Sequence, residues 1–485
     1  MSLLRGKRLA GMDEGAARFT ASVLQDGPLL EPTVRINQAH IVSLGMDGVL
    51  DRGKAAAILS ALEGATSGFA MDPSLEDVHM NLEAFVAKSA GEAGGYMNLG
   101  KSRNDQVSTA LRMRARQEIL GVLRKLLGSV SALLDASSGA DDALIPGYTH
   151  LQVAQPTTLS HYLLCYAEAL LRDAGRLADC YGRVNLSPMG SAAFAGTTVN
   201  VNRRRVAELL GFDGIVENTM DAVSARDFMI EAISAFLIVQ LDLSRLAEDL
   251  IFYSSSEASY ITIPDAYAST SSIMPQKKNA AALETVRAKA SSVLGMLTAA
   301  ASLVKGLPQS YDLDLQEMNS LLWKSSEAVM DSLSMVAGTV RGMTYDAERS
   351  SRNALLGFGV AADLAETLCV EFGIQFRAAH HMVGAVAAGL PREYTPAQVG
   401  RLLQKEAEAG GFSVPASRVE QVCTPQASIA LKKTEGSPNP SMAKATRLRL
   451  KEDAGRLGSW LDSKEASLAR STGRLAEEIA KIRRR

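Results

Sequence analysis

The feature that most constrains the fold is a long stretch of chain without a helix breaker. Residues 215–263, 49 in all, contain neither glycine nor proline, whereas a helix in a globular protein averages about 11–12 residues. Long helices gain most of their stability from packing, so we expect this stretch to form part of a bundle of long helices. Residues 228–239 are apolar on nearly every side of a helix, which predicts burial all round and favours oligomerisation.

The apolar periodicity predicts other long helices on both sides of this stretch. The long segments are 106–137, 157–184, 217–255, 280–305 and 321–337. Shorter helices are predicted at 13–23, 31–44, 51–63 and 76–88, and a charged amphipathic helix with a solvated face at 464–485. We therefore predict an all-α fold of three domains: an N-terminal helical domain (1–105), a central long-helix bundle (106–357) and a C-terminal helical domain (358–485).

Composition excludes several classes of partner. Lys and Arg number 51 against 53 Asp and Glu, for a net charge of −2, which gives no support to nucleic-acid or membrane-surface binding. The four cysteines lack metal-ligand spacing and fit free thiols in a reducing compartment. Residues 1–7 have no apolar signal core, and the most apolar window, 228–243, is interrupted by polar side chains. We expect a cytoplasmic protein.

The most distinctive polar stretch is residues 270–279, which read Thr-Ser-Ser-Ile-Met-Pro-Gln-Lys-Lys-Asn. Pro264 ends any helix that enters from the N-terminal side, and Asn279 is a good N-cap for the helix that follows. The stretch is therefore predicted to be a loop between two long helices. Its hydroxyl, ammonium and backbone amide groups suit the stabilisation of negative charge. Composition alone also fits an ordinary solvated loop.

Residues 271–279 resemble the signature loop of the fumarase/aspartase superfamily, in the form found in argininosuccinate lyases. The resemblance implies that Ser271 is the catalytic base and that Lys277 and Asn279 stabilise developing charge. It also implies that Glu284, on the next helix, orients an acid/base histidine. Because serine is a poor base in water, the loop must stabilise an alkoxide-like Ser271 through Lys277 and backbone amides.

A second match, residues 100–107, lies just before the first long helix. Its Ser-Arg-Asn-Asp string could simply cap that helix, because such side chains accept bonds from free N–H groups. The resemblance implies in addition that Ser102, Arg103 and Asn104 bind substrate carboxylates. An arginine suits this task because it can donate two parallel hydrogen bonds to one carboxylate.

A third match, residues 146–152, places Thr149 and His150 in a polar turn ahead of a helix. A lone histidine is more often structural than catalytic, but histidine titrates near neutral pH, as a proton-transfer group should. The resemblance implies an acid/base role for His150, assisted by Thr149. Further matches imply substrate contacts at Ser22, Tyr311 and Gln316. His79 and Arg226 also lie in matching stretches but could equally well be structural.

The departures from the family pattern lie around the substrate rather than among the catalytic residues. Asn319 stands where the family usually has a lysine, which removes a positive charge expected to meet substrate. Other departures are Asn98, Ala110, Val153 and Ala280. Elimination chemistry is therefore better supported than the identity of the leaving group.

The resemblance implies reversible anti elimination of argininosuccinate to L-arginine and fumarate, a step of arginine biosynthesis. It also implies a homotetramer whose active sites are shared between subunits, without a metal or organic cofactor. Two alternatives stay open at this point. One is another lyase of the superfamily that releases fumarate from a different succinyl-amine; the reason to consider it is that Asn319 replaces the usual lysine. The other is a catalytically silent structural protein on this fold, as lens crystallins related to this family are.

Overall fold

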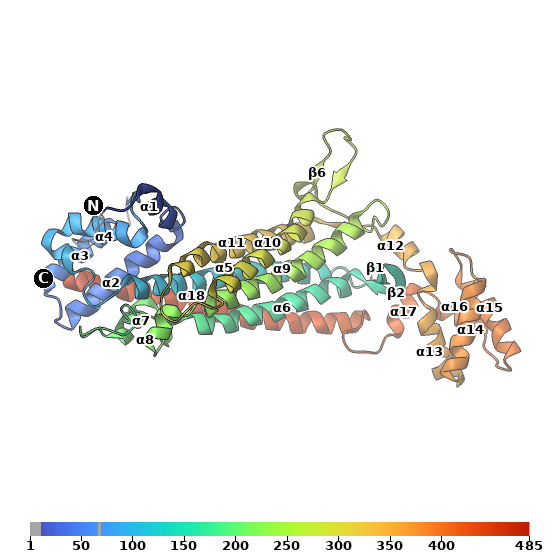
Figure 1. Ribbon diagram of the computed structural model, residues 1–485. Coiled ribbons are helices and arrows are strands. Elements are labelled where there is room, and N and C mark those ends of the chain that lie inside the picture. The colour runs from blue at the N-terminus through green and yellow to red at the C-terminus, as the bar shows by residue number, and fades with distance from the viewer. Residues whose placement is uncertain (1–10, 66–68, 485) are drawn as a thin grey trace.

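The computed structural model describes residues 11–65 and 69–484. It is an elongated helical molecule, with short helices at one end, a bundle of long helices in the middle and a smaller helical group at the other end (Figure 1). Its described strands occur only as short pairs, so the all-α prediction is confirmed. No helix within the described ranges has the length and apolar character needed to cross a membrane.

Most of the N-terminal helices begin at an acidic side chain that caps them. They are α1 (Glu14–Thr20), α2 (Leu30–Met46), α3 (Arg52–Gly64) and α4 (Val78–Ala90), with the 3₁₀ turns η1 (Gly27–Leu29) and η2 (Gly91–Tyr96). The side chains of Asp13, Asp51 and Asp77 each accept a hydrogen bond from a backbone N–H of the first turn of α1, α3 and α4. Such caps satisfy donors that the helix itself leaves unpaired.

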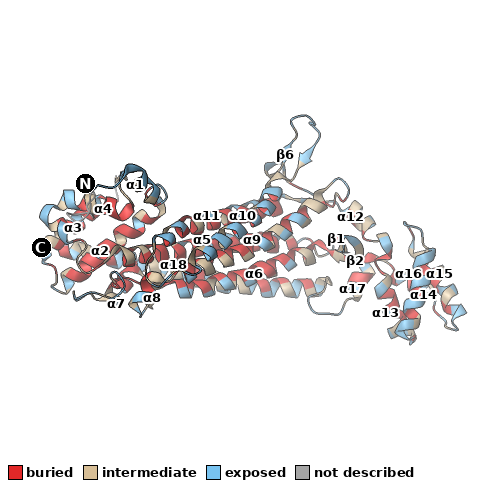
Figure 2. Cartoon of the chain, viewed as in Figure 1, coloured by how far each residue is buried: buried red, intermediate tan, exposed pale blue. Residues whose placement is uncertain are grey.

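Five long helices form the bundle: α5 (Arg103–Ser137), α6 (Leu159–Val184), α9 (Asp227–Ser254), α10 (Ala281–Val304) and α11 (Asn319–Gly342). α5 packs on α6 and α11, and α9 packs on α6, α10 and α11. Figure 2 shows their buried residues facing the interior of the bundle. The short helices α7 (Arg203–Leu210) and α8 (Thr219–Ser224) lie near the N-terminal end.

The strands form four two-stranded pairs at the ends and side of the bundle. The antiparallel pairs are β1 (Leu144–Thr149) with β2 (Gln152–Thr158), β5 (Ile261–Thr262) with β8 (Thr344–Tyr345), and β6 (Ser269–Thr270) with β7 (Lys278–Asn279). The parallel pair is β3 (Leu186–Ser187) with β4 (Gly214–Ile215). Two further 3₁₀ turns are η3 (Asp265–Tyr267) and η4 (Leu313–Met318).

The last part of the chain contains a separate helical group and a long returning helix. The group comprises α12 (Ala347–Asn353), η5 (Leu356–Phe358), α13 (Ala361–Phe372), α14 (Phe376–Gly389), α15 (Pro396–Ala409), α16 (Ala416–Val422) and α17 (Pro425–Leu431). Buried apolar residues between 358 and 423 form their own core cluster, apart from the larger cluster of the bundle. This separation supports a C-terminal domain that begins near residue 358; the three-domain division itself stays a prediction.

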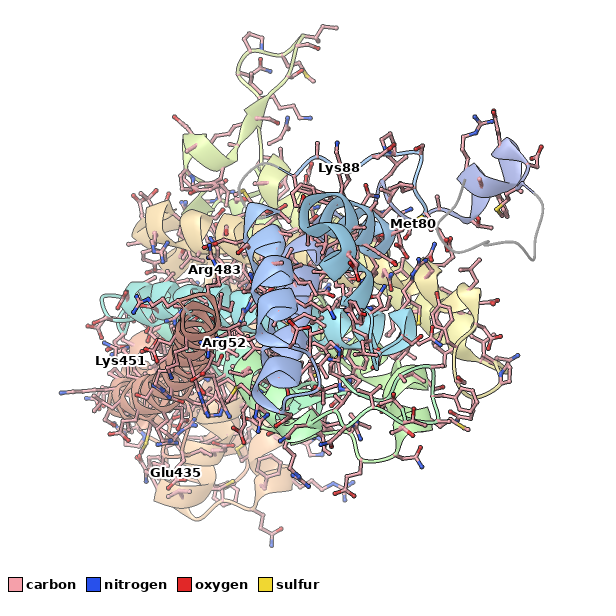
Figure 3. The ribbon with its side chains drawn as sticks, turned by 90° about the vertical axis from the view of Figure 1, so that its left-hand side faces the viewer. Arg52, Met80, Lys88, Glu435, Lys451 and Arg483 are labelled. Atoms are coloured by element: carbon pink, nitrogen blue, oxygen red, sulfur yellow. The ribbon has the colours of Figure 1, made fainter. Side chains whose placement is uncertain are left out.

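The final helix, α18 (Pro440–Arg483), runs back along α5 and α6 as far as α2 and α3. The predicted helix at 464–485 is therefore only the end of a 44-residue helix. Its last turn is fastened to α3: Arg52 Nε donates to the carbonyl of Ile482 over 3.2 Å, and Arg483 forms an ion pair with Glu63. Figure 3 shows Arg52 and Arg483 on the same side of the molecule.

Two details of the predicted helices are wrong. Residues 217–255 do not form one helix, because α8 and α9 are separated at Ala225 and Arg226. Arg226 Nη1 donates to the carbonyls of Val223 (3.1 Å) and Ala225 (2.8 Å), so a side chain satisfies acceptors that the break leaves open. Asn279 is not an N-cap either: it pairs with β6, and Ala280 occupies the cap position of α10.

Candidate active site

The residues predicted to carry the chemistry lie in three separate places within one chain (Figure 1). Five of the predicted substrate-binding residues line one cavity near the N-terminal end of the bundle, which we call the N-terminal cavity: Ser22, Arg103, Asn104, Tyr311 and Gln316. Thr149 and His150 lie on the β1–β2 hairpin, and Ser271 and Lys277 lie on the loop between β6 and β7. Each place has its own local geometry.

The N-terminal cavity joins segments that are distant in sequence. Arg103 Nη1, on the first turn of α5, lies 3.0 Å from an Asp77 carboxylate oxygen and 3.3 Å from one of Glu76. Gln316 Nε2 donates to the carbonyl of Thr20 over 3.1 Å, which ties η4 to the last residue of α1. The cavity is thus formed where the start of α5, the start of α4 and η4 meet.

A buried carboxylate supports the wall that carries Ser22. Ser22 Oγ donates to Asp26 Oδ2 over 2.8 Å, and the backbone N–H of Val78 donates to the same oxygen over 3.1 Å. Burial raises the pKa of Asp26 to about 6, while these two hydrogen bonds act in the opposite direction. Our sequence reasoning missed Asp26, because a single aspartate in a turn is usually solvated and no local pattern signals its burial.

Ser102 and Asp105 form a capping box at the start of α5. Asp105 is fully buried, and its carboxylate accepts backbone hydrogen bonds from Ser102 (3.0 Å), Gly190 (3.1 Å) and Ala192 (2.9 Å). Asn104 Nδ2 donates to the carbonyl of Ala193 over 3.0 Å. These bonds fix the first turn of α5 against the 190–193 loop. Ser102 therefore caps α5 and does not line the N-terminal cavity, whereas Arg103 and Asn104 do. Its role in substrate binding stays a prediction.

The cavity contains two further residues that the sequence left undecided, His79 and Arg226. Both are buried. Burial lowers the pKa of His79 to about 4, so its imidazole is neutral at pH 7. Burial also lowers the pKa of Arg226, to about 10, which leaves the guanidinium charged at pH 7. Of these two residues, only Arg226 brings a positive charge to the cavity wall.

The β1–β2 hairpin holds His150 in a strained turn. His150 and Leu151 are its two central residues, with φ of 54° and 57°. Two-residue turns of this kind favour Asn-Gly, and a left-handed residue other than glycine costs about 1–2 kcal/mol. His150 had been expected just ahead of a helix, but α6 begins only at Leu159. Tyr148 Oη lies 2.6 Å from Tyr260 Oη, which fastens the hairpin to the segment after α9.

The loop between β6 and β7 stands out from the side of the bundle (Figures 1 and 2). Ser271 Oγ accepts hydrogen bonds from the backbone N–H groups of Ile273 (3.2 Å) and Met274 (3.1 Å). Lys278 Nζ lies 2.5 Å from Asp265 Oδ1. Lys277 is exposed and has no ion-pair partner among residues 11–65 and 69–484. Ser271 Oγ therefore accepts from two backbone N–H groups, and Lys277, six residues along the chain, has an ammonium group without an ion-pair partner among the described residues.

Helix length keeps these places apart within one chain. α5 has 35 residues, so at about 1.5 Å per residue it separates Arg103 from the approach to β1 by about 52 Å. α10 has 24 residues and separates the Ser271 loop from Tyr311 by about 36 Å. Glu284 lies exposed on the first turn of α10, at the end that carries the loop. One chain does not bring the predicted catalytic and substrate-binding residues together.

Comparisons with known proteins agree on one enzyme family. Residues 7–295 match a family model described as lyase. The argininosuccinate lyase of Methanothrix thermoacetophila is 39% identical over 483 residues, which cover 99% of this chain and 96% of that protein. The argininosuccinate lyase of Methanothermobacter thermautotrophicus is 38% identical, over 92% of this chain and 97% of that protein.

Solved structures share the fold along nearly the whole chain. The crystal structure of EDDS lyase in complex with formate has a TM-score of 0.88 and 28% identity, and covers 98% of this chain and 96% of that one. Recombinant class II fumarase from Schistosoma mansoni has a TM-score of 0.72 and 17% identity, over 86% of this chain and 95% of that one. The second likeness concerns the fold alone.

Proposed function

The chain belongs to the argininosuccinate lyase family, and we propose from this premise that its active site cleaves argininosuccinate reversibly to L-arginine and fumarate. The argininosuccinate lyase of Methanothrix thermoacetophila aligns with almost the whole chain, the lyase family model matches residues 7–295, and the motifs point to the same function. The observation that carries the proposal is the N-terminal cavity, where predicted substrate contacts from separate segments of the chain meet. The alternative of a lyase for another succinyl-amine is not favoured by these relatives.

In the proposed mechanism Ser271 removes the proton from the carbon next to a substrate carboxylate. The electron pair left behind moves into that carboxylate, which Lys277 and Asn279 stabilise as it gains negative charge. The C–N bond to the guanidino group then breaks, fumarate forms, and His150 donates a proton on the leaving-group side. Thr149 and Glu284 assist His150 by holding its imidazole.

The environment of Ser271 supports its assignment as the base. A serine hydroxyl loses its proton only where the alkoxide is stabilised. The two backbone N–H groups that already donate to Ser271 Oγ would hold that charge without reorganisation. The strained turn at His150 supports the second assignment, because strain in a non-glycine turn is often kept where function requires it.

We propose further that the protein is a homotetramer with sites shared between subunits. Within one chain, α9 is not buried all round: Ile230 and Ile238 are half-buried and Leu241 is 45% exposed. Between residues 288 and 302 the exposed side chains of α10 are Ala288, Ser291, Ser292, Leu294, Gly295, Thr298, Ala299, Ala301 and Ser302. A solvent-facing helix surface normally carries charge, so this uncharged face fits burial against other subunits.

A spectrophotometric assay tests the proposed function. Purified protein is mixed with argininosuccinate, and absorbance is followed at the ultraviolet band of fumarate, with the Ser271→Ala variant as the matched control. We expect absorbance to rise with the wild type and not with the variant. Fumarate release only from a different succinyl-amine would select the alternative lyase, and no release from any of them would select the silent structural reading.

A further inference from the structure

We propose that two glycines of α11, Gly338 and Gly342, position the loop that carries Ser271. We call these two glycines, with the helix backbone around them, the α11 notch. The inference rests on the proposed function, in which Ser271 is the base, and it names residues that act through the position of Ser271. It begins from the close approach of two side chains to the backbone of α11.

Two residues of the segment before β6 occupy the α11 notch. A Cβ atom added to Gly338 would overlap Oη and Cζ of Tyr267 and lie 2.7 Å from its Cε1. A Cβ atom added to Gly342 would lie 2.7 Å from Pro264 Cγ. Carbon atoms in contact are normally about 3.5–4.0 Å apart, so an alanine at position 338 would require the Tyr267 ring to retreat by more than about 1 Å.

These two contacts belong to a longer attachment between the chain that leads into the loop and the end of α11. The attachment joins residues in opposite chain order: Tyr260 with Asp346, Ile261 with Tyr345, Thr262 with Thr344, Pro264 with Gly342 and Tyr267 with Gly338. The first contact is a backbone hydrogen bond of 2.9 Å, and the next two form the pairing of β5 with β8. The segment before the loop is therefore attached to the end of α11 along its length.

The turn that contains Tyr267 transmits the position of its ring to the loop. This turn is η3, which packs against both α10 and α11. Within it the backbone N–H of Tyr267 donates to the carbonyl of Pro264 over 3.0 Å. β6 begins two residues later and pairs with β7, where Lys278 forms an ion pair with Asp265 of η3. A shift of the ring therefore moves the base of the loop, and Ser271 with it.

Glycine inside a helix needs a reason from packing, because it lowers the stability of the helix relative to alanine. Gly338 lies inside α11, between the buried residues Ala337 and Thr339. The close approach of the Tyr267 ring supplies the reason. Tyr267 Oη makes no hydrogen bond with residues 11–65 and 69–484, so the packing of the ring, and not its hydroxyl, makes the attachment.

The expected effect of the α11 notch falls on the chemical step rather than on substrate binding. In the proposed mechanism Ser271 and Lys277 act on the transition state, whereas Arg103 and Tyr311 line the N-terminal cavity, away from the loop. Displacing a catalytic group by about 1 Å can lower a rate by about 10²-fold. We therefore expect a disturbed notch to lower kcat with little change in KM.

The test follows cleavage of argininosuccinate by wild type, Gly338→Ala, Tyr267→Ala and Tyr267→Phe. We expect Gly338→Ala and Tyr267→Ala to lower kcat by about 10–10²-fold, with KM changed less than about threefold. Tyr267→Phe keeps the ring and should retain at least about half of the kcat that Tyr267→Ala loses. The matched control is Gly182→Ala in α6, where an added Cβ atom meets no described atom within 4 Å and kcat should not change.

A double variant shows whether Gly338 acts through Tyr267. If the clash with the ring is the cause, Gly338→Ala lowers kcat in the wild type but not in the Tyr267→Ala background, so the two effects are not additive. Additive losses would assign Gly338 to the packing of the bundle and overturn the inference. If Gly338→Ala does not fold, as judged by circular dichroism, the two Tyr267 variants decide. Equal kcat values for Tyr267→Ala and Tyr267→Phe, whether both high or both low, overturn the role of the ring.

The outcomes separate this inference from the proposed function. A wild type that cleaves argininosuccinate, combined with Gly338→Ala and Tyr267→Ala variants of wild-type kcat, overturns the role of the α11 notch alone. A rise in KM without a fall in kcat does the same, because it would place these residues in substrate binding. A wild type without argininosuccinate turnover overturns the proposed function and this inference with it.

Discussion

Mixing two inactive variants, His150→Asn and Ser271→Ala, tests whether the active site is assembled from more than one chain. The reason lies in the rigid helices that separate its parts. α5 has 35 residues and α10 has 24, which correspond to about 52 Å and 36 Å. These lengths separate Arg103 and Tyr311 from His150 and Ser271, which both lie toward the opposite end of the bundle (Figure 1). Because catalysis requires contacts of about 3 Å, side-chain movement within one chain cannot bring the two groups together. Symmetric packing of several chains can close them, because ends of different subunits then meet.

The expected recovery follows from random assembly. The two variants are denatured together in equal amounts and refolded. If one site takes His150 from one chain and Ser271 from another, each residue is intact with a chance of one half. About one quarter of the sites should therefore be intact, and activity should return to about 25% of a wild-type sample refolded in the same way. Each variant refolded alone serves as the control and should remain inactive.

The result that refutes this reasoning is equally definite. If His150 and Ser271 of one site come from the same chain, every site carries one lesion and no activity returns. Two differently tagged variants, followed by native mass spectrometry, show whether mixed oligomers formed. Mixed oligomers without activity would show that His150 and Ser271 of one site come from a single chain, and a monomeric wild type with full turnover would refute the shared-site proposal itself.

Three further predictions concern single residues. Ser271→Ala should lower kcat by about 10²–10⁴-fold with nearly unchanged substrate binding; more than about a tenth of the wild-type kcat would exclude Ser271 as the base. Asn319→Lys should lower KM for argininosuccinate several-fold with kcat within about twofold, because it adds a charge that meets substrate in the ground state; argininosuccinate activity that only the variant possesses would show that our substrate is wrong. The third concerns Asp26, whose pKa is raised by burial from 3.8 to about 6, so its contribution to stability is fully present below pH 3.8 and is lost as the pH rises through about 6. From pH 4 to 7 the wild type should lose roughly 2 kcal/mol of unfolding free energy that Asp26→Asn does not lose. Unfolding free energies from urea denaturation that change equally with pH in both proteins would contradict this.

The long helices could be predicted from the sequence because their signals are local. Apolar periodicity marks the extent of α5, α6 and α10. Local signals also mark the shorter helices α1, α3 and α4, because Asp13, Asp51 and Asp77 stand where acidic side chains cap helices. The break between α8 and α9 gave no such signal. It is made without glycine or proline, by a buried arginine that captures two carbonyls. That bonding depends on burial, which a local pattern does not contain.

The candidate site, like the fold, could be predicted from the sequence only in part. The motifs pointed to residues such as Arg103 and Tyr311, which meet in one cavity. They could not show that Ser271 lies at the opposite end of α10 from Tyr311, because a sequence motif contains no information on distances in space. Asp26 was missed for a related reason: its partners are the hydroxyl of Ser22 and the N–H of Val78, and the latter lies 52 residues away. Long-range hydrogen bonds of this kind become visible only in the folded chain.

The returning helix α18 imposes an order on biosynthesis. Arg52 near the start of the chain bonds to Ile482, 430 residues later, and a ribosome adding about 5–20 residues per second needs roughly 20–90 s to cover that interval. During this time α2, α3 and the outer faces of α5 and α6 have been synthesised, but the helix that packs on them has not. The apolar surfaces awaiting α18 stay open to water and to neighbouring nascent chains. Chaperones that bind such surfaces should therefore act on this protein late in translation, and their release should follow the docking of α18.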